Sequence, residues 1–289
     1  MSSDPRPRAP RSDLAFRRRG SMRGVVAALV GLLALGGCSG RDLGFPTGAS
    51  DRAEYVETLW FGAWIAAGVV GVFVFGLMVW AVVYYRRRSE ADIPNQIRYN
   101  LPIEVLYTVA PLIVVGVFFF HTVQTDAEIY ASTDDPDHEV VVLGQRWSWS
   151  FSYVEEEAVG GQSVFTTGTP AERPVLVLPV GETVAFELRA QDVIHAFWVP
   201  AFYFKQDVIP GRESSFTITP TREGTYAGRC SELCGVYHTR MLFTVEIVSP
   251  EEYDAYLQEL EAAGNVGIVE PSSETTEIVG EESEEGAAP

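Results

Sequence analysis

The chain has 289 residues, a formal net charge of −18 and three cysteines. Residues 1–38 hold seven Arg and two Asp, so the remainder carries a net charge of −23. Because nucleic acid is a polyanion that is bound by basic surfaces, this acidity excludes it as a partner.

Residues 1–38 have the organisation of a bacterial secretory signal. A basic region is followed by the apolar run Val25 to Leu35, which is typical of a targeting segment rather than of a folded element. Leu35 to Cys38 resembles a lipobox, in which the cysteine becomes the lipidated first residue, although Gly36 is an imperfect match. We therefore expect a lipoprotein-type signal peptide over 1–38 and a lipid anchor at Cys38. An uncleaved signal anchor is the alternative.

Two apolar runs predict a transmembrane helical hairpin over residues 56–126, after an extracytoplasmic linker at 39–55. The run from Leu59 to Tyr85 is about 40 Å long as a helix, and the hydrocarbon core of a bilayer is about 30 Å thick. The run from Ile103 to Val123 is long enough as well. The segment between them carries Arg86, Arg87, Arg88 and Arg98. The positive-inside rule assigns this segment to the cytoplasm, so everything after residue 126 is expected outside.

Short β-type segments separated by Gly and Pro fill most of the predicted domain at residues 127–262. This spacing is typical of an all-β sandwich. In residues 147–153 aromatic and serine residues alternate, so a strand there places the rings on one face. The expected strands are 139–143, 146–153, 174–178, 183–189, 214–219, 224–229 and 241–248.

A helix and an acidic tail are expected at the end of the chain. Ser249, Pro250 and Glu252 predict a capping box with a proline at the first helical position, which opens a helix through about Glu261. Residues 263–289 contain seven glutamates among Ser, Thr, Gly and Ala. Because such a segment buries little apolar surface, we expect it to be disordered.

Metal-binding side chains are concentrated in the twelve residues from Cys230 to Met241. Thiolate, thioether and imidazole ligands together favour copper over magnesium or calcium. Two thiols alone would favour a disulfide outside the cytoplasm. A nearby imidazole, a thioether and the distant His195 favour a metal, because loops at one end of a sandwich converge. The segment contains Cys230, Glu232, Cys234, His238 and Met241.

These residues resemble subunit II of haem–copper cytochrome c oxidases, and the likeness covers about residues 56–260. It implies a two-helix transmembrane hairpin followed by an all-β cupredoxin-like sandwich, a Greek-key β-barrel. The matching segments are Cys230-x-Glu232-x-Cys234-Gly235-x-x-His238-x-x-Met241, Gln191-Asp192-Val193-x-His195 and Asp207-x-Ile209-Pro210-Gly211-Arg212.

The resemblance implies a dinuclear copper A centre in this domain. Two thiolates would bridge two copper ions, each ion would take one imidazole, and a thioether and a backbone carbonyl would complete the set. Cys230 and Cys234 would be the bridging thiolates, and His195 and His238 would be the two imidazole ligands. Met241 would supply the thioether, and Glu232 would supply the backbone carbonyl.

Three residues take further roles by the same resemblance. The Glu232 carboxylate would help to bind magnesium or manganese at the interface with subunit I, since carboxylates suit hard ions. Trp147 matches the residue through which electrons enter, although Ser148 departs from the tyrosine that commonly follows it. Glu104 would lie near the mouth of a proton pathway. Helix capping by Asn100 and the helix macrodipole also explain an acidic residue there.

The sequence therefore predicts subunit II of cytochrome c oxidase in the plasma membrane of a bacterium. It would take electrons from a cytochrome c-type donor and pass them to haem in subunit I, where O2 is reduced to water with proton translocation. Subunit III is a further expected partner. The sequence contains no Cys-x-x-Cys-His motif for a fused c-type haem. A membrane-tethered copper-delivery protein, and a metal-free interaction module with a Cys230–Cys234 disulfide, remain as alternatives.

Overall fold

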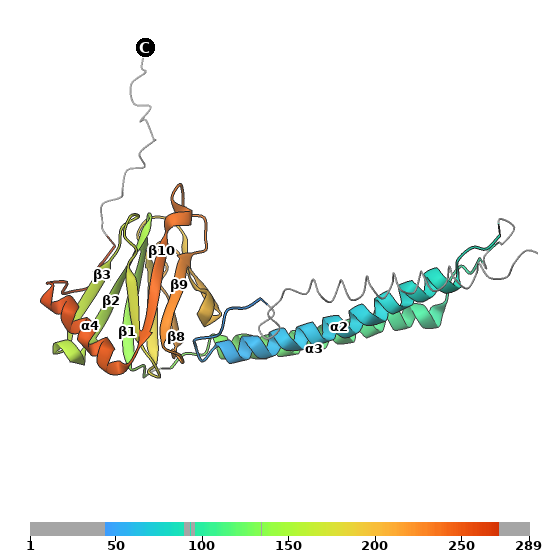
Figure 1. Ribbon diagram of the computed structural model, residues 1–289, viewed down its shortest axis with the longest axis horizontal. Coiled ribbons are helices and arrows are strands. Elements are labelled where there is room, and N and C mark those ends of the chain that lie inside the picture. Colours follow the sequence, from blue (N-terminus) through green and yellow to red (C-terminus); the bar gives the residue numbers. More distant parts are fainter. Residues whose placement is uncertain (1–43, 90–92, 94–95, 134, 272–289) are drawn as a thin grey trace, which may run out of the picture. The chain divides into compact units, whose positions relative to one another are not determined.

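The computed structural model describes residues 44–89, 93, 96–133 and 135–271. The predicted signal peptide with Cys38 and the end of the predicted acidic tail lie outside these residues. Two long helices are followed by a β-sandwich and a short helix (Figure 1). The predicted fold class is thus confirmed.

The two long helices are α2, Ala53–Tyr84, and α3, Leu101–Ile129. Both are long and apolar enough to cross a membrane, with mean hydropathies of 2.5 and 2.2 in their most apolar windows. They extend a few residues beyond the predicted hairpin at 56–126, because a helix keeps its backbone hydrogen bonds after its apolar run has ended. The Asn100 side chain accepts the Ile103 backbone N–H, so the predicted cap of α3 is present.

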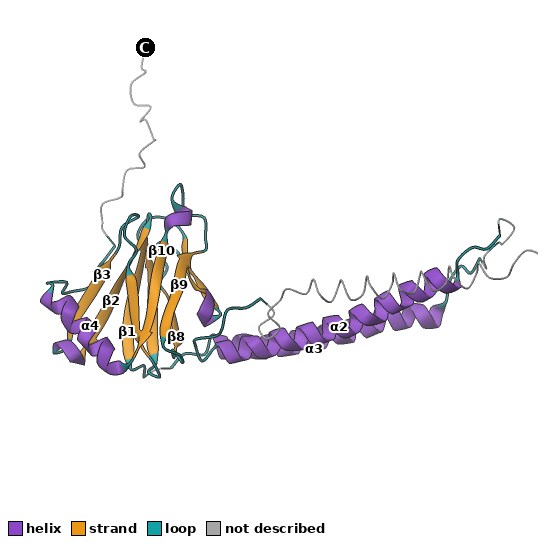
Figure 2. Cartoon of the chain, viewed as in Figure 1, coloured by secondary structure: helices purple, strands orange, loops and turns teal. Residues whose placement is uncertain are grey.

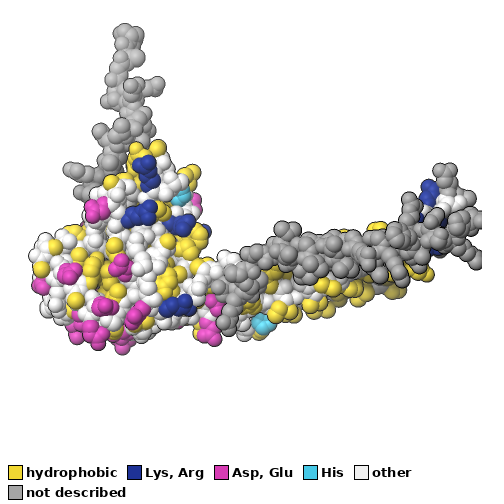
Figure 3. All heavy atoms as spheres, in the orientation of Figure 1, with side chains coloured by type: hydrophobic (Ala, Val, Ile, Leu, Met, Phe, Trp, Pro, Cys, Tyr) yellow, Lys and Arg dark blue, Asp and Glu magenta, His cyan; other side chains and the backbone are white. Residues whose placement is uncertain are grey.

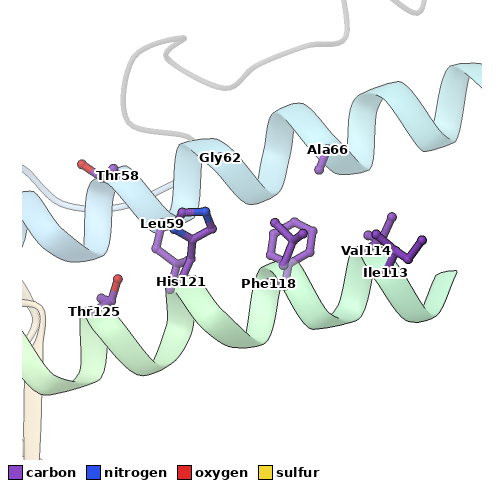
Figure 4. A pocket seen from close by; sticks show the side chains of 10 residues that line it. Thr58, Leu59, Gly62, Ala66, Ile113, Val114, Phe118, His121 and Thr125 are labelled. Carbon is purple, nitrogen blue, oxygen red and sulfur yellow. The ribbon is translucent and has the colours of Figure 1, made fainter. Parts of the chain in front are cut away.

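A cavity of about 540 Å³ lies between α2 and α3 (Figure 4). The small residues Gly62 and Ala66 of α2 face it, and α3 contributes Phe118, His121 and Thr125 among others. His121, a titratable residue within the second apolar run, is part of this lining.

Two five-stranded sheets form the sandwich (Figure 2). The first has the order β3-β2-β1-β5-β8, and the second has the order β4-β10-β9-β6-β7. The first sheet contains β1 His138–Gln145, β2 Ser148–Glu156, β3 Gln162–Thr167, β5 Val184–Ala190 and β8 Ser214–Ile218. The second contains β4 Val175–Pro179, β6 His195–Val199, β7 Phe204–Val208, β9 Gly224–Cys230 and β10 Leu242–Val248.

An aromatic core fills the space between the sheets. Trp149, Phe151 and Tyr153 of β2 are fully buried, as the alternating pattern predicted. Trp149 packs edge-on against Phe243, which stacks on Phe197 at 5.1 Å between ring centres. Trp147 does not join this row, because it lies in the turn before β2 rather than in the strand.

Three strands were not predicted: β3, β6 and β7. β3 and β7 are edge strands of their sheets and contain polar residues, so hydrophobic alternation is weak in them. β6 begins at His195 and is a short, mostly buried apolar run. A short, continuous apolar run shows no alternation of apolar and polar residues, so its sequence does not distinguish a strand from a buried helix segment.

The last helix, α4, spans Pro250–Ala262 and begins with the predicted capping box. It buries Tyr253, Leu257 and Leu260. The chain then continues along β3, where the Phe165 N–H donates to the Asn265 carbonyl at 3.0 Å. The sequence analysis assigned residues 263–271 to the disordered tail, but the structure describes them as part of the domain. The backbone groups of edge strand β3 bind this segment.

Strand directions define two opposite ends of the sandwich. The loop end carries the β1–β2 turn with Trp147, the β5–β6 connection at 191–194 and the β9–β10 connection at 231–241. The acidic end carries the start of β1, the end of β2 and the start of α4. All the residues predicted as copper ligands belong to the loop end.

Candidate metal centre

Two strand ends and one loop supply the predicted ligands. His195 opens β6 and Cys230 closes β9, so regular sheet hydrogen bonding fixes both backbones. Cys234 and His238 lie in the β9–β10 connection, and Met241 directly precedes β10. His195, Met241 and both cysteines are buried.

The donor atoms of these residues converge. The Sγ atoms of Cys230 and Cys234 are 3.8 Å apart, and both thiols are free. A disulfide needs about 2.05 Å, so none is formed at this separation. One ligand atom each from His195, Cys230 and Cys234 all lie within 4.8 Å of one another. Around the second sulfur, Cys234 Sγ is 3.5 Å from His238 Nδ1 and 3.7 Å from Met241 Sδ.

The backbone carbonyl and the side-chain carboxylate of Glu232 have different surroundings. Its carbonyl oxygen lies 3.2 Å from Cys230 Sγ, while the residue is exposed to solvent. The carbonyl is thus close to the sulfur cluster, and the carboxylate is free to meet another group. This division agrees with the two roles that the sequence analysis assigned to the residue.

Asp192 orients the buried imidazole of His195. The Asp192 Oδ1 atom is 2.9 Å from His195 Nε2, which leaves Nδ1 directed at Cys230 Sγ, 3.9 Å away. Asp192 also accepts the backbone N–H groups of Val193 and Arg146 at 2.7 and 2.8 Å. Burial disfavours the charged carboxylate, but these donors outweigh it and lower the pKa of Asp192 to about 2. The sequence analysis quoted Asp192 without a role, and its three-residue spacing from His195 was the available signal.

The two thiols differ in acidity. Burial raises the pKa of a thiol, but the adjacent His195 imidazole more than offsets this for Cys230, whose pKa is lowered. Burial and repulsion from Cys230 both raise the pKa of Cys234. The pair therefore holds one negative charge more readily than two, and a cation between the sulfurs would relieve their repulsion.

Trp147 contacts the loop that carries the thiols. Its indole Nε1 donates to the Cys234 carbonyl at 3.1 Å, and its ring meets Tyr237 edge-on at 5.0 Å. Gly235 lies against the ring with φ +122°, and a Cβ there would approach the indole nitrogen to 3.0 Å. The indole is therefore in direct contact with the backbone of a predicted ligand.

Glu104 lies on the first turn of α3 and not among these groups. Its Oε1 accepts the Asn100 backbone N–H at 2.9 Å, and its own N–H donates to the Asn100 carbonyl. Helix capping therefore explains this residue structurally. The predicted proton-pathway role concerns groups outside this chain.

The donor set fits copper. Two thiols, two imidazoles, a thioether and a carbonyl lie in contact around the Cys230 and Cys234 sulfurs, and soft sulfur ligands with imidazole select copper rather than magnesium or calcium. The apolar core that holds these residues, including Phe197 and Trp149, keeps their backbones fixed.

Two family models match the chain. One, described as cytochrome c oxidase subunit II, periplasmic domain, covers residues 139–248, and the other, its transmembrane domain, covers residues 39–123. Together they account for the hairpin and most of the sandwich.

Relatives match over nearly the whole length. A probable cytochrome c oxidase subunit 2 of Streptomyces avermitilis is 42% identical over 93% of this chain and 94% of its own. The cytochrome c oxidase subunit 2 of Mycobacterium tuberculosis strain H37Rv is 33% identical over 83% and 82%. The crystal structure of the periplasmic domain of subunit II of cytochrome oxidase from Bradyrhizobium japonicum covers 45% of this chain and 96% of its own, with 28% identity and a TM-score of 0.39. The chain belongs to the cytochrome c oxidase subunit II family.

Proposed function

We propose that this chain is the electron-accepting subunit of a haem–copper cytochrome c oxidase and holds a dinuclear copper A centre at its loop end. The observation that carries the proposal is the convergence of two free, buried thiols with two imidazoles and a thioether. A mononuclear copper site needs only one thiolate, whereas this arrangement offers two.

Each residue of the site has a defined task. Cys230 and Cys234 would hold the copper pair with their thiolates, His195 and His238 would bind it with their imidazoles, and Met241 and the Glu232 carbonyl would complete the set. When bound, the copper pair supplies a one-electron acceptor whose geometry changes little on reduction. The surrounding strands keep the ligands rigid, which supports fast electron transfer.

The reaction moves single electrons. A reduced haem iron in a cytochrome c-type donor loses one electron, which enters near Trp147 and passes through this chain to haem in subunit I. Four such electrons and four protons convert one O2 to two waters there, coupled to proton translocation. Glu104 stands near the start of the proton pathway in this scheme.

The proposal includes further partners. Glu232 binds magnesium or manganese at the interface with subunit I through its exposed carboxylate. The hairpin anchors the chain among subunits I and III in the plasma membrane of a bacterium, with the sandwich on the extracytoplasmic side. Cys38 carries the lipid anchor.

The test is a Cys234→Ser variant in the assembled oxidase. We expect the loss of the second copper and of the paramagnetic signal of an electron shared by two copper nuclei, with donor oxidation reduced to background. Thr239→Ser is the matched control, since it changes an exposed position of the same loop and leaves every predicted ligand in place.

Two outcomes contradict the proposal. Unchanged donor oxidation in Cys234→Ser means that the thiol pair is not on the electron path. One copper per wild-type chain with an ordinary four-line spectrum instead indicates the copper-delivery alternative.

A further inference from the structure

Three polar side chains meet at one end of the cavity between α2 and α3. Thr58 of α2 and Thr125 of α3 lie opposite each other there, and the His121 imidazole points into the space between the helices (Figure 4). The cavity of about 540 Å³ thus has a polar end, while the rest of its lining is apolar. The apolar lining residues are Leu59, Gly62, Ala66, Ile113, Val114, Val117 and Phe118.

None of these three polar side chains has a hydrogen-bond partner within the part of the chain that the structure describes. The His121 ring meets the neighbouring Phe120 ring edge-on at 5.5 Å between ring centres, which is not a polar contact. A polar group without a partner is costly in the hydrocarbon region, and an ionisable residue inside a membrane span marks a binding site. The cavity therefore calls for a ligand that brings hydrogen-bonding atoms to its polar end.

The polar end lies toward the outer surface of the membrane in the proposed topology. Thr58 follows the start of α2 at Ala53, and Thr125 precedes the end of α3 at Ile129. The other end of the hairpin carries the arginine-rich connecting segment. Figure 3 shows hydrophobic side chains along the hairpin and basic side chains at that other end.

The cavity is about as deep as one leaflet of a bilayer. Helix α2 rises about 12 Å from Thr58 to Ala66, and α3 covers about 18 Å from Thr125 to Ile113. Half of the hydrocarbon core is about 15 Å thick. A partner helix of 12 Å length and about 10–12 Å diameter would fill about 1,000 Å³, whereas the cavity offers about 540 Å³. A single hydrocarbon chain has the depth without the width.

The chemistry of the polar end specifies the head of the ligand. Threonine hydroxyls and an imidazole N–H donate hydrogen bonds, and a carboxylic ester carbonyl accepts them. Among the described residues that line the cavity, none is Asp, Glu, Lys or Arg. Since a phosphate group is held by such basic side chains, a phosphate would stay outside at the membrane surface.

We propose that this cavity binds one acyl chain of an outer-leaflet phospholipid, whose ester carbonyl accepts hydrogen bonds from His121, Thr58 and Thr125. Lipid tails are as apolar as the lining, so retention against bulk lipid comes from these hydrogen bonds and from filling a space that the two helices leave empty. The inference takes the membrane placement of the hairpin from the proposed function and does not depend on the metal centre.

Photolabelling of the assembled oxidase tests the site. The probe is a phosphatidylcholine whose sn-2 chain carries a photoreactive diazirine. The oxidase is loaded with the probe, transferred to nanodiscs of unlabelled phosphatidylcholine and then irradiated, so that only retained probe reacts. Peptide mass spectrometry should place the adducts on lining residues such as Ala66 and Val114. Adducts spread evenly over the outer faces of α2 and α3 would overturn the proposal.

Matched variants test the apolar interior and the polar end separately. Gly62→Leu should lower the retained label about tenfold, because its side chain would enter the space of the acyl chain. Gly68→Leu is the control, since a Cβ on either glycine meets nothing within 4 Å and Gly68 does not line the cavity. Thr125→Val should lower the label about threefold by removing one hydrogen bond. Thr122→Val, exposed on the same helix, should not change it.

Three results would overturn the inference. The first is unchanged label in both Gly62→Leu and Thr125→Val, while copper content and subunit composition are those of the wild type. The second is displacement of the label by a prenylated quinone but not by excess unlabelled phosphatidylcholine. The third is an unlabelled wild-type cavity together with loss of subunit I from Gly62→Leu, because the cavity would then seat a side chain of that subunit. Copper content and its paramagnetic spectrum report the metal centre independently of all three.

Discussion

Asp192 joins the predicted ligand His195 to the turn that carries Trp147. One carboxylate oxygen meets the imidazole and the other meets the backbone and guanidinium of Arg146. A carboxylate behind a metal-binding imidazole fixes the ring and increases its basicity. Asp192 therefore links the proposed metal site to the turn that carries Trp147.

Replacing Asp192 tests this double contact. Asp192→Ala should weaken copper binding by about 10- to 100-fold, because the imidazole loses its partner. Competition with a copper chelator measures the affinity. Asp192→Asn should retain more copper than Asp192→Ala, since the amide oxygen still accepts from His195. Asp254→Asn, exposed on α4, controls for a general loss of acidity, and equal copper affinity in all three variants would contradict the assignment.

At the level of single residues, the spacing of the ligands was readable in the sequence and their partners were not. The segment from Cys230 to Met241 and the upstream His195 were singled out before any fold was known. The role of Asp192 was not assigned, although its three-residue spacing from His195 was a signal, and its second contact, with Arg146, links residues 46 apart. Only the convergence of the β1–β2 turn with the β5–β6 connection creates that contact.

Among the elements, long or strongly periodic segments were predicted, whereas the edge strands β3 and β7 and the short buried strand β6 were missed. The hairpin, β2 and α4 carry apolar runs, strict alternation or a capping box. β3 and β7 each have one sheet neighbour along their length, so their sequences need less apolar surface. The segment at 263–271 follows β3 through backbone hydrogen bonds, which side-chain patterns do not report.

Helix α4 is held to the sandwich mainly by its buried face. Leu257 is fully buried between α4 and the core, and the helix alone is too short to be stable in water. Leu257→Ala should therefore lower the free energy of unfolding by about 2–5 kcal/mol. Chemical denaturation followed by near-ultraviolet circular dichroism measures the change. Glu259→Ala on the exposed face should stay within about 0.5 kcal/mol, and an equal loss in both variants would mean that helix propensity, not burial, holds α4.

Across the whole molecule, charge is separated between the two ends of the sandwich. The three loop-end connections at 146–147, 191–194 and 231–241 carry two carboxylates, those of Asp192 and Glu232, whereas the acidic end gathers carboxylates around His138. In the structure His138 lies largely buried between two carboxylates, with Nδ1 at 2.9 Å from Glu156 and Nε2 at 2.8 Å from Glu182.

This cluster connects four parts of the domain. His138 opens β1, Glu156 closes β2 and Glu182 lies in the β4–β5 turn, while Tyr253 of α4 packs on the imidazole and donates to Glu156 at 2.9 Å. Burial lowers the pKa of His138, but the hydrogen bonds and charges of the two glutamates outweigh it and raise the pKa to about 9. Asp137, Glu139 and Asp254 line a cavity together with His138 and add negative potential.

The raised pKa of His138 makes the stability of the domain depend on pH. The folded state keeps the imidazole protonated up to about pH 9, whereas an unfolded chain releases that proton near pH 6.5. The folded state thus binds more protons between these values, so its stabilisation is complete below about pH 6.5 and is lost as pH rises through 9. The loss amounts to at most about 3 kcal/mol.

The His138→Gln variant separates the pH-dependent contribution of His138 to stability from the contributions of all other titrating groups. The variant should be less stable than the wild type at pH 6, and the difference should shrink steadily toward pH 9.5, where the wild-type imidazole is neutral as well. Thermal unfolding of the full chain in detergent at several pH values measures the difference. Glu182→Gln should reduce the pH dependence by part of the same amount, because Glu156 and its bond from Tyr253 remain. A difference between wild type and His138→Gln that stays constant from pH 6 to 9.5 would show that folding does not raise the pKa of His138, and that its packing against Tyr253 rather than its charge ties α4 to the acidic end.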